Sequence, residues 1–265
     1  MLTSGATSDG PVGYDVRGAG SPVVLLHPFP FDRRIWASVS EALSPRHRVI
    51  AVDGRGFGET PLTDGGDAIA GGADDVAAVL DQLDVPRAAV LGMSMGGYAA
   101  LAFAARHPGR LAALVLCDTR AGADDAKLRA ARDGAIARIR ETGSGPYLDG
   151  SLARLLSPSA PPARVAFLRA RAETRAASLI AGIEALRDRP DRTGELAAIR
   201  CPTLVLRGTD DQVTPAEDMQ AMASAIAGAT FVPLDRAGHL SHIDAPGAFE
   251  RALAPFLARA LEGVS

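Results

Sequence analysis

The chain of 265 residues is long enough for one sizeable domain, or for one domain with an inserted lobe. Hydrophobic residues make up 47% of it and charged residues 22%, which provides for a substantial core and excludes intrinsic disorder. The net charge of −3 comes with no basic patch, so a nucleic-acid partner is not expected.

The first ten residues lack a basic region followed by an apolar run, so no signal peptide is predicted. No stretch approaches the roughly 18 apolar residues that a membrane span needs. We therefore expect a cytoplasmic protein that does not bind membranes. The sequence carries no indication of the oligomeric state.

Short apolar runs alternate along the chain with longer amphipathic segments. In chain order, the prediction is a strand over 23–27, a helix over 33–43, a strand over 49–53, a helix over 73–83, a strand over 88–93, a helix over 95–107, strands over 111–118 and 203–207, a helix over 216–227, a strand over 230–234 and a helix over 247–261. Several strands are apolar almost throughout, which is typical of parallel strands buried on both faces. The alternation predicts an α/β fold with helices on both faces of a parallel sheet.

One interval, residues 120–198, shows no convincing strand. It is rich in alanine and arginine, with helical spacing over 126–140 and 172–186, and prolines and glycines interrupt it. We interpret it as a helical insertion between two strands of the sheet. The alternative is a set of ordinary surface helices without the role of a lid.

The sharpest motif is Gly92-Met93-Ser94-Met95-Gly96, which lies between a predicted strand and a predicted helix. A serine on such a tight turn adopts strained backbone angles and holds its hydroxyl clear of the sheet. Neighbouring segments of the chain pass so close to the turn that any residue larger than glycine would clash with them at the flanking positions. The turn also places the N–H of Met95 at a helix N-terminus, where negative charge is stabilised. We predict that Ser94 is a nucleophile; the alternative is a glycine-rich turn with an idle serine.

A serine hydroxyl is a weak nucleophile without a base, and the chain has five histidines. His239 lies in a loop after the last predicted strand, at the carboxyl edge of the sheet, as Ser94 does. His242 competes with it but is expected on the first turn of the following helix, where it points elsewhere. His47 and His107 lie in polar stretches, which indicates surface positions. We predict that His239 is the base.

Two adjacent aspartates, Asp210 and Asp211, follow the predicted strand over 203–207 at the same edge. The base needs an acid to orient it and to stabilise its protonated form. From these residues alone, either aspartate could be the acid. With either one, the chain order of serine, aspartate and histidine is the order expected for this arrangement.

The tetrahedral oxyanion needs a second backbone donor from the loop after an early strand, which reads His27-Pro28-Phe29-Pro30. Proline has no N–H, so Phe29 is the only donor between the two prolines, which also stiffen it. We predict an oxyanion hole made of the N–H groups of Phe29 and Met95. His27 is expected to anchor the loop by hydrogen bonding.

A second glycine-rich run, residues 53–58, follows another strand. No helix starts directly after it and the phosphate-binding lysine is absent, which argues against a phosphate cradle. We expect a turn stabilised by aspartate and arginine at the active-site edge. No Cys/His/Asp cluster has metal-ligand spacing, so neither a metal nor a cofactor is expected.

Together these motifs resemble the α/β-hydrolase family over nearly the whole chain, and within it the 3-oxoadipate enol-lactonase-like hydrolases, small carboxylesterases and cofactor-free haloperoxidases. The matching pieces are 27–30, 53–58, 92–97, 208–211 and 238–239. The resemblance implies an eight-stranded, mostly parallel sheet with a helical cap inserted after the sixth strand. It also places the acid on Asp211 and the oxyanion donors on Phe29 and Met95. One departure is Pro28, where the family commonly has glycine.

The resemblance implies a core domain of residues 1–119 and 199–265 and a helical cap of residues 120–198. It further implies a serine hydrolase that cleaves a carboxylic ester or lactone, as a small-molecule substrate, through a Ser-His-Asp triad and an acyl-enzyme. Haloalkane dehalogenases and epoxide hydrolases of this fold have aspartate at the position of Ser94, so serine favours acyl transfer. The alternatives are a C–C bond hydrolase, a cofactor-free haloperoxidase or perhydrolase, and a ligand receptor that barely turns over.

Overall fold

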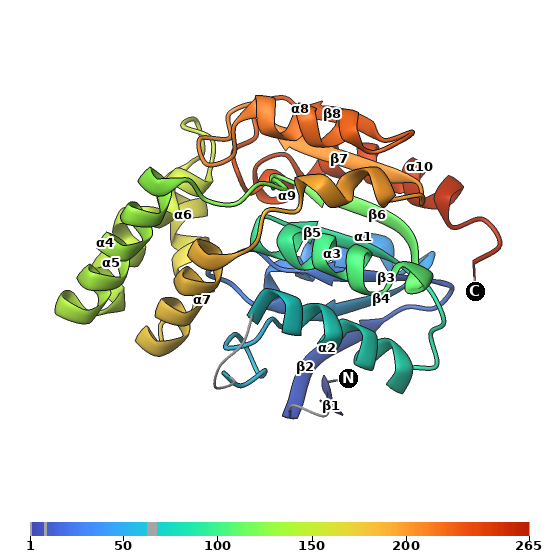
Figure 1. The fold of residues 1–265 in the computed structure, drawn as a ribbon, viewed down its shortest axis with the longest axis horizontal. Helices are drawn as coiled ribbons and strands as arrows, with labels where there is room; N and C mark the ends of the chain where they lie inside the picture. Colours follow the sequence, from blue (N-terminus) through green and yellow to red (C-terminus); the bar gives the residue numbers. More distant parts are fainter. Residues whose placement is uncertain (1, 8–9, 63–67, 265) are drawn as a thin grey trace.

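The computed structural model describes residues 2–7, 10–62 and 68–264. An eight-stranded sheet runs through the molecule in the strand order β1-β2-β4-β3-β5-β6-β7-β8 (Figure 1). The pairs β1–β2 and β2–β4 are antiparallel, and every other neighbouring pair is parallel. The prediction of a mostly parallel, eight-stranded α/β sheet is confirmed.

Six of the eight strands lie within two residues of predicted ones. The strands are β1 Leu2–Thr7, β2 Gly10–Arg17, β3 Ser21–Leu26, β4 His47–Val52, β5 Ala88–Met93, β6 Leu111–Cys117, β7 Thr203–Gly208 and β8 Thr230–Leu234. The apolar pattern did not indicate β1 and β2, which form the antiparallel edge of the sheet. Strands there lack the continuous apolar run of a strand that is buried on both faces.

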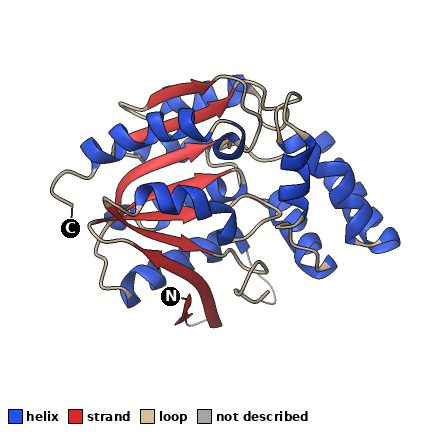
Figure 2. Ribbon diagram, turned by 180° about the vertical axis from the view of Figure 1, so that it is seen from behind, coloured by secondary structure: helices blue, strands red, loops and turns tan. Residues whose placement is uncertain are grey.

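Helices cover both faces of the sheet. They are the 3-10 turn Arg33–Trp36 with α1 Ala37–Leu43, α2 Ala68–Gln82, α3 Met95–Arg106, α8 Ala216–Ala225, the short α9 Ser241–Asp244 and α10 Pro246–Ala260. Figure 1 looks onto the face covered by α2, α3 and α8, and Figure 2, seen from behind, shows α1 and α10 on the other. None of the helices in the described part of the chain is both long enough and apolar enough to cross a membrane.

Alternate residues of each central strand belong to two different cores. In β3, for example, Val23 and Leu25 belong to one cluster and Val24 and Leu26 to the other, because successive side chains of a strand point to opposite faces. Burial of each such side chain stabilises the fold by about 1.5–3 kcal/mol. The two cores therefore hold the central strands, and the loops at their carboxyl ends, in fixed positions.

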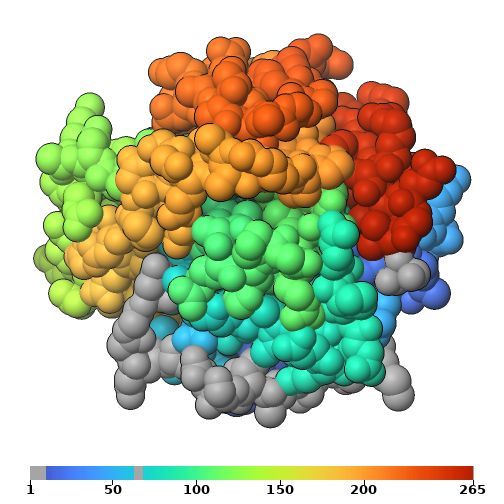
Figure 3. Space-filling view, turned by 45° about the vertical axis from the view of Figure 1, so that its right-hand side comes forward, coloured from blue at the N-terminus to red at the C-terminus, as the bar shows by residue number. Residues whose placement is uncertain are grey.

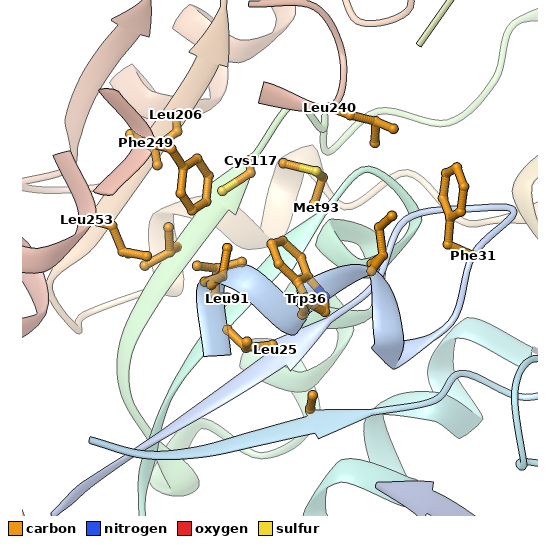
Figure 4. Packing of buried hydrophobic residues seen from close by; sticks show 14 of the residues in the cluster. Leu25, Phe31, Trp36, Leu91, Met93, Cys117, Leu206, Leu240, Phe249 and Leu253 are labelled. Carbon is orange, nitrogen blue, oxygen red and sulfur yellow. The ribbon is translucent and has the colours of Figure 1, made fainter. Parts of the chain in front are cut away.

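Figure 4 shows part of one core, on the face covered by α1 and α10. Leu25, Leu91 and Cys117 come from three neighbouring strands and pack with Trp36 and Phe249. All five side chains are fully buried. Their packing fixes both the strand that precedes Ser94 and the strand beside it.

The segment between β6 and β7 is helical, as predicted, and is called the cap segment (residues 120–198) below. Its helices are α4 Ala126–Thr142, α5 Ser144–Ser151, α6 Pro162–Arg169 and α7 Ala176–Asp188, with 3-10 turns at Leu152–Leu155 and Thr193–Ala198. Helices α4 to α7 stand at one end of the sheet (Figure 1), and in the space-filling view they form a lobe on the left that continues into the core (Figure 3).

Candidate active site

Ser94 lies on a sharp turn between β5 and α3. Its backbone angles are φ 51° and ψ −115°, a conformation that residues with a side chain rarely adopt. The Ser94 N–H donates to the carbonyl of Cys117 at 2.9 Å, and its carbonyl accepts from the Thr119 hydroxyl at 2.9 Å. These hydrogen bonds to the neighbouring strand end hold the turn in place.

The flanking glycines have the structural role that the sequence indicated. A β-carbon on Gly92 would lie 2.1 Å from the carbonyl oxygen of Gly96, and one on Gly96 would lie 2.1 Å from that of Leu26. Both distances are far below van der Waals contact, and both neighbours are backbone atoms. The turn therefore requires glycine at these two positions.

His239 lies between Ser94 and Asp211. Its Nε2 is 2.7 Å from Ser94 Oγ, and its Nδ1 is 3.0 and 3.1 Å from the two carboxylate oxygens of Asp211. The three residues follow the carboxyl ends of β5, β8 and β7, which meet at one edge of the sheet. The structure thus brings together the three residues that the sequence singled out, although nearly 150 positions separate the serine from the histidine.

The sequence motifs left open whether Asp210 or Asp211 is the acid. In the structure, the two aspartates have different partners. Asp210 accepts from the Ser157 hydroxyl at 2.6 Å, whereas Asp211 faces His239. Asp211 also accepts from the backbone N–H of Val213 at 2.7 Å, so a tight turn fixes its carboxylate. The geometry therefore favours Asp211 as the partner of the histidine.

The negative charge of Asp211 and the positive charge of protonated His239 stabilise each other. Burial disfavours the charged form of His239, but the charge of Asp211 and its hydrogen bond outweigh this effect and raise the pKa of His239. Burial likewise opposes ionisation of Asp211, yet the interactions with His239 and with two backbone N–H groups lower its pKa. The arrangement is suited to stabilising a protonated imidazole next to Ser94.

The other histidines have other surroundings. His242 is buried, its ring centroid lies 4.5 Å from that of Trp36, and burial lowers its pKa to about 3. It lies on the first turn of α9, as expected, and its ring packs near Trp36 and Phe249. His107 is half-buried and lies 2.8 Å from Asp74. The expectation of a surface position was wrong for His47, which is buried because it begins the central strand β4.

His27 anchors the loop over residues 27–30, as expected. Its Nε2 accepts from the N–H of Gly54 at 2.8 Å, and its Nδ1 lies 3.1 Å from the carbonyl of Pro28. Because Nε2 accepts, the proton is on Nδ1, which donates to that carbonyl. The imidazole thereby ties the loop to the turn that follows β4.

Asp53 begins that turn, which is the glycine-rich run over residues 53–58. Its carboxylate accepts from the guanidinium and, at 2.8 Å, from the N–H of Arg33. Arg55, inside the run, pairs with Asp75 at 2.7 Å. The expected turn stabilised by aspartate and arginine is present, with an arginine from outside the run as the partner of Asp53.

The predicted oxyanion donors belong to two different segments. Met95 is the first residue of α3, and Phe29 follows β3. Neither backbone N–H donates to an acceptor in the described part of the chain. Both are therefore free to bind a ligand atom, and the N-terminus of α3 adds a partial positive charge at Met95.

The sequence motifs did not indicate Asp118, a fully buried carboxylate whose charge acts on His239. Its oxygens accept from the N–H of Gly208 at 2.7 Å and from the Ser241 hydroxyl at 2.5 Å. Burial and the negative charge of Asp211 raise the pKa of Asp118 to about 7, and its own charge contributes to the raised pKa of His239. The feature of the sequence that could have indicated Asp118 is its position directly after a wholly apolar strand.

Ser94 and His239 line a cavity of about 600 Å³, within the range of small-molecule sites. Phe29 and Tyr98 line it from the core, and residues of α4 and α5 line it from the cap segment. The site therefore combines a hydroxyl, an imidazole and a carboxylate with room for a small organic molecule.

The chain is similar to known proteins over nearly its whole length. The family model described as "alpha/beta hydrolase fold" matches residues 21–246. A Variovorax paradoxus protein provisionally named carbamate hydrolase RutD is 33% identical over 262 residues, which cover 94% of this chain and 97% of the relative. A thermophilic esterase from Thermogutta terrifontis is 34% identical with a TM-score of 0.91, covering 98% of this chain and 99% of its own. The enol-lactonase from Burkholderia xenovorans LB400 is 29% identical with a TM-score of 0.88, covering 97% and 100%.

Proposed function

Since the chain belongs to the α/β-hydrolase family and is a hydrolase, we propose that it cleaves a carboxylic ester or lactone with Ser94, His239 and Asp211 as its catalytic triad. The observation that carries this proposal is the unbroken line of hydrogen-bonding distances from Asp211 through His239 to Ser94, beside a cavity. The esterase and the enol-lactonase among its structural relatives support the choice of an ester or lactone.

In the proposed first half-reaction, Ser94 Oγ attacks the substrate carbonyl carbon while Nε2 of His239 takes the hydroxyl proton. The carbonyl oxygen becomes an oxyanion, which accepts from the N–H groups of Phe29 and Met95. The C–O bond to the leaving group then breaks, and His239 gives its proton to the departing alkoxide. The products of this step are an alcohol and an acyl group on Ser94.

In the second half-reaction, water attacks the acyl carbon and gives one proton to Nε2 of His239. The resulting oxyanion uses the same two donors. When the bond to Ser94 Oγ breaks, the proton returns to the serine and the carboxylic acid leaves. Asp211 keeps the imidazole oriented and stabilises its protonated form in both halves.

The test is Ser94→Ala, assayed with short p-nitrophenyl esters. We expect turnover to fall on the order of 10⁴-fold or more, because the nucleophile is lost while the fold is retained. Ser38→Ala, which changes an exposed serine on α1, is the matched control and should keep parental activity. Equal ester hydrolysis by Ser94→Ala and the parent would show that the proposed mechanism is wrong.

A carbamate is a second candidate substrate, because one full-length relative carries the name of a carbamate hydrolase. The same triad would attack the carbamate carbonyl, so the site alone does not separate the two classes. A panel of matched p-nitrophenyl esters, lactones and carbamates, run with the parent and with Ser94→Ala, discriminates between them. Faster Ser94-dependent turnover of carbamates than of esters would favour this second candidate.

We also propose that the cap segment acts as a cap over a core made of residues 1–119 and 199–265. The support is that α4, α5 and the turn after α5 contribute residues to the wall of the cavity. In this arrangement the core supplies the reacting groups and the cap segment decides which substrates fit.

A further inference from the structure

The charged side chains that line the cavity beside Ser94 are positive. Arg120, Arg132, Arg138 and Arg154 line it, and in the described part of the chain no aspartate or glutamate does. Arg120 follows β6, two of the others lie on α4 and the fourth lies in the turn after α5. All four guanidinium groups therefore belong to the cap segment, whereas Ser94 and His239 belong to the rest of the chain.

Helix α4 presents one face to the cavity. The residues of this face recur every three or four positions, as the geometry of a helix requires. They are Leu128, Ala131, Arg132, Ala135 and Arg138. The apolar members and the alkyl parts of the two arginines make a surface for a hydrocarbon chain, with charge at defined points along it.

The carboxylates near this wall do not balance its charge. Buried Asp124 lies 2.6 Å from Arg120, 3.1 Å from Arg132 and 2.7 Å from Arg189, so one carboxylate serves three guanidinium groups. Asp218 adds one contact with Arg120 at 3.4 Å. The cluster thus keeps a net positive charge before the remaining arginines are considered.

Arg138 and Arg154 have no such partner. Within the residues that the structure describes, neither guanidinium forms an ion pair or a hydrogen bond with the protein. By contrast, Arg140 on the same helix lies 3.8 Å from Glu184 and does not line the cavity. Two uncompensated cations, both partly open to solvent, therefore line the cavity that a substrate would occupy.

We propose that the substrate of this site is anionic: an ester or lactone whose acyl group carries a carboxylate, bound by Arg138 and Arg154, with Arg132 lining the same cavity. The planar guanidinium fork matches a carboxylate and binds it through charge-assisted hydrogen bonds. This inference rests on the proposed function for the position of the reacting carbonyl at Ser94. The carboxylate lies at the end of the acyl chain away from that carbonyl.

The kinetic test compares mono-p-nitrophenyl glutarate, which carries a carboxylate, with the neutral ester p-nitrophenyl valerate. We expect the parent to prefer the anionic ester at least about ten-fold in kcat/KM. Arg138→Gln and Arg154→Gln should each lower this ratio, and together they should lower it about ten-fold. Because the sites are partly open to solvent, added salt should also lower the parental ratio.

Arg140→Gln is the matched control, because it removes a guanidinium from the same helix outside the cavity. It should keep the parental ratio of the two esters. A parental ratio near one, or a ratio that the Arg138 and Arg154 substitutions leave unchanged, overturns the proposal. The single variants keep the test valid if the double variant does not fold.

A binding measurement separates this proposal from the proposed function. Isothermal titration of both esters into Ser94→Ala, with and without the two arginine substitutions, needs no turnover. We expect the anionic ester to bind at least about ten-fold more tightly, and the arginine substitutions to abolish the difference. If the parent hydrolyses neither ester but this selectivity is present, the proposed function fails and the anion site stands. Equal binding of the two esters overturns the anion site, whatever the catalytic result.

Discussion

Ser94 occupies a backbone conformation, φ 51° and ψ −115°, that glycine adopts at much lower cost. Such strain costs about 1–3 kcal/mol, and it persists only where the surroundings enforce it. Here the Ser94 N–H binds the end of β6, and the Ser94 carbonyl accepts from the Thr119 hydroxyl just beyond that strand. The hydroxyl gains its position beside His239, and the folded state loses part of its stability in exchange.

We therefore expect Ser94→Gly to abolish hydrolysis and to stabilise the protein. Relief of strain should exceed the added chain entropy of glycine, for a net gain of about 1 kcal/mol in the free energy of unfolding. Urea denaturation measures this gain. Ser94→Ala keeps the β-carbon and serves as the control, so a Ser94→Gly protein less stable than Ser94→Ala would contradict the prediction.

The protonation of Asp118 makes the free energy of unfolding depend on pH. Its raised pKa, about 7 in the folded protein because of burial and the charge of Asp211, means that the folded state holds this proton more tightly than the unfolded chain does. The resulting contribution to stability is fully present below about pH 4, the ordinary range of an aspartate. It is lost as the pH rises through about 7.

Asp118→Asn should remove this dependence on pH. We expect the free energy of unfolding of the parent, relative to that of Asp118→Asn, to fall between about pH 4 and pH 7. Urea denaturation at several pH values measures the difference. Asp235→Asn, which changes an exposed aspartate, controls for the substitution itself. A difference between parent and Asp118→Asn that stays constant over this range would contradict the prediction.

Among the secondary-structure elements, β5, the turn at Ser94 and α3 form the unit that positions the candidate site. The close approaches at Gly92 and Gly96 let the start of α3 pack directly against its own turn and against the end of β3. This packing brings the N-terminus of α3 next to the loop that contains Phe29. The two predicted oxyanion donors thus depend on one tight contact between elements.

Gly96→Ala tests that contact. The added β-carbon would meet the carbonyl oxygens of Leu26 at 2.1 Å and His27 at 2.9 Å, so either α3 or the loop has to move. We expect a loss of at least about 3 kcal/mol in the free energy of unfolding, together with a lower kcat. Denaturation and ester kinetics measure the two effects.

The control for this variant is Gly72→Ala in α2, where the new β-carbon meets nothing within 4 Å. Alanine is the better helix former, so this substitution should stabilise the protein by about 0.5–1 kcal/mol. If Gly96→Ala were as stable and as active as Gly72→Ala, the close approach would not be required.

At the scale of the whole molecule, Asp244 connects the cap segment with the loop that carries His239. Its buried carboxylate accepts from the N–H of Gly238 at 2.9 Å, from the N–H of Ser157 at 2.6 Å and from Arg164 at 3.0 Å. Ser157 and Arg164 belong to the cap segment. A displacement of the cap segment would therefore be transmitted to the loop of the predicted base.

Asp244→Ala should weaken both regions at once. Loss of a buried carboxylate leaves three donors without a partner, which we expect to cost about 3 kcal/mol in the free energy of unfolding. The kcat for p-nitrophenyl esters should fall as well, because the His239 loop loses an anchor. Urea denaturation and steady-state kinetics measure the two effects.

Asp149→Ala removes an exposed aspartate of the cap segment that pairs with Arg169, and it is the matched control. A surface pair of this kind contributes between about 0 and 1 kcal/mol. Similar stability and kcat for Asp149→Ala and Asp244→Ala would show that Asp244 does not couple the two regions.

Local patterns in the sequence predicted the central strands, the strained turn at Ser94 and the candidate residues at the carboxyl edge of the sheet. Strands buried on both faces are apolar without interruption, and a tight turn needs glycine at particular positions, so both leave local signals. The edge strands β1 and β2 and the short helices α5 and α6 left no comparable signal. Their sequences lack a long apolar run or a long helical period.

The three-dimensional fold established which side chains from distant segments meet. It distinguished Asp211 from Asp210 by the turn that aims one of them at His239, and it placed Asp118 beside that pair. It also gathered arginines from the cap segment on one wall of the cavity. Contacts between segments far apart in the chain depend on packing and not on local sequence, so no local pattern predicts them.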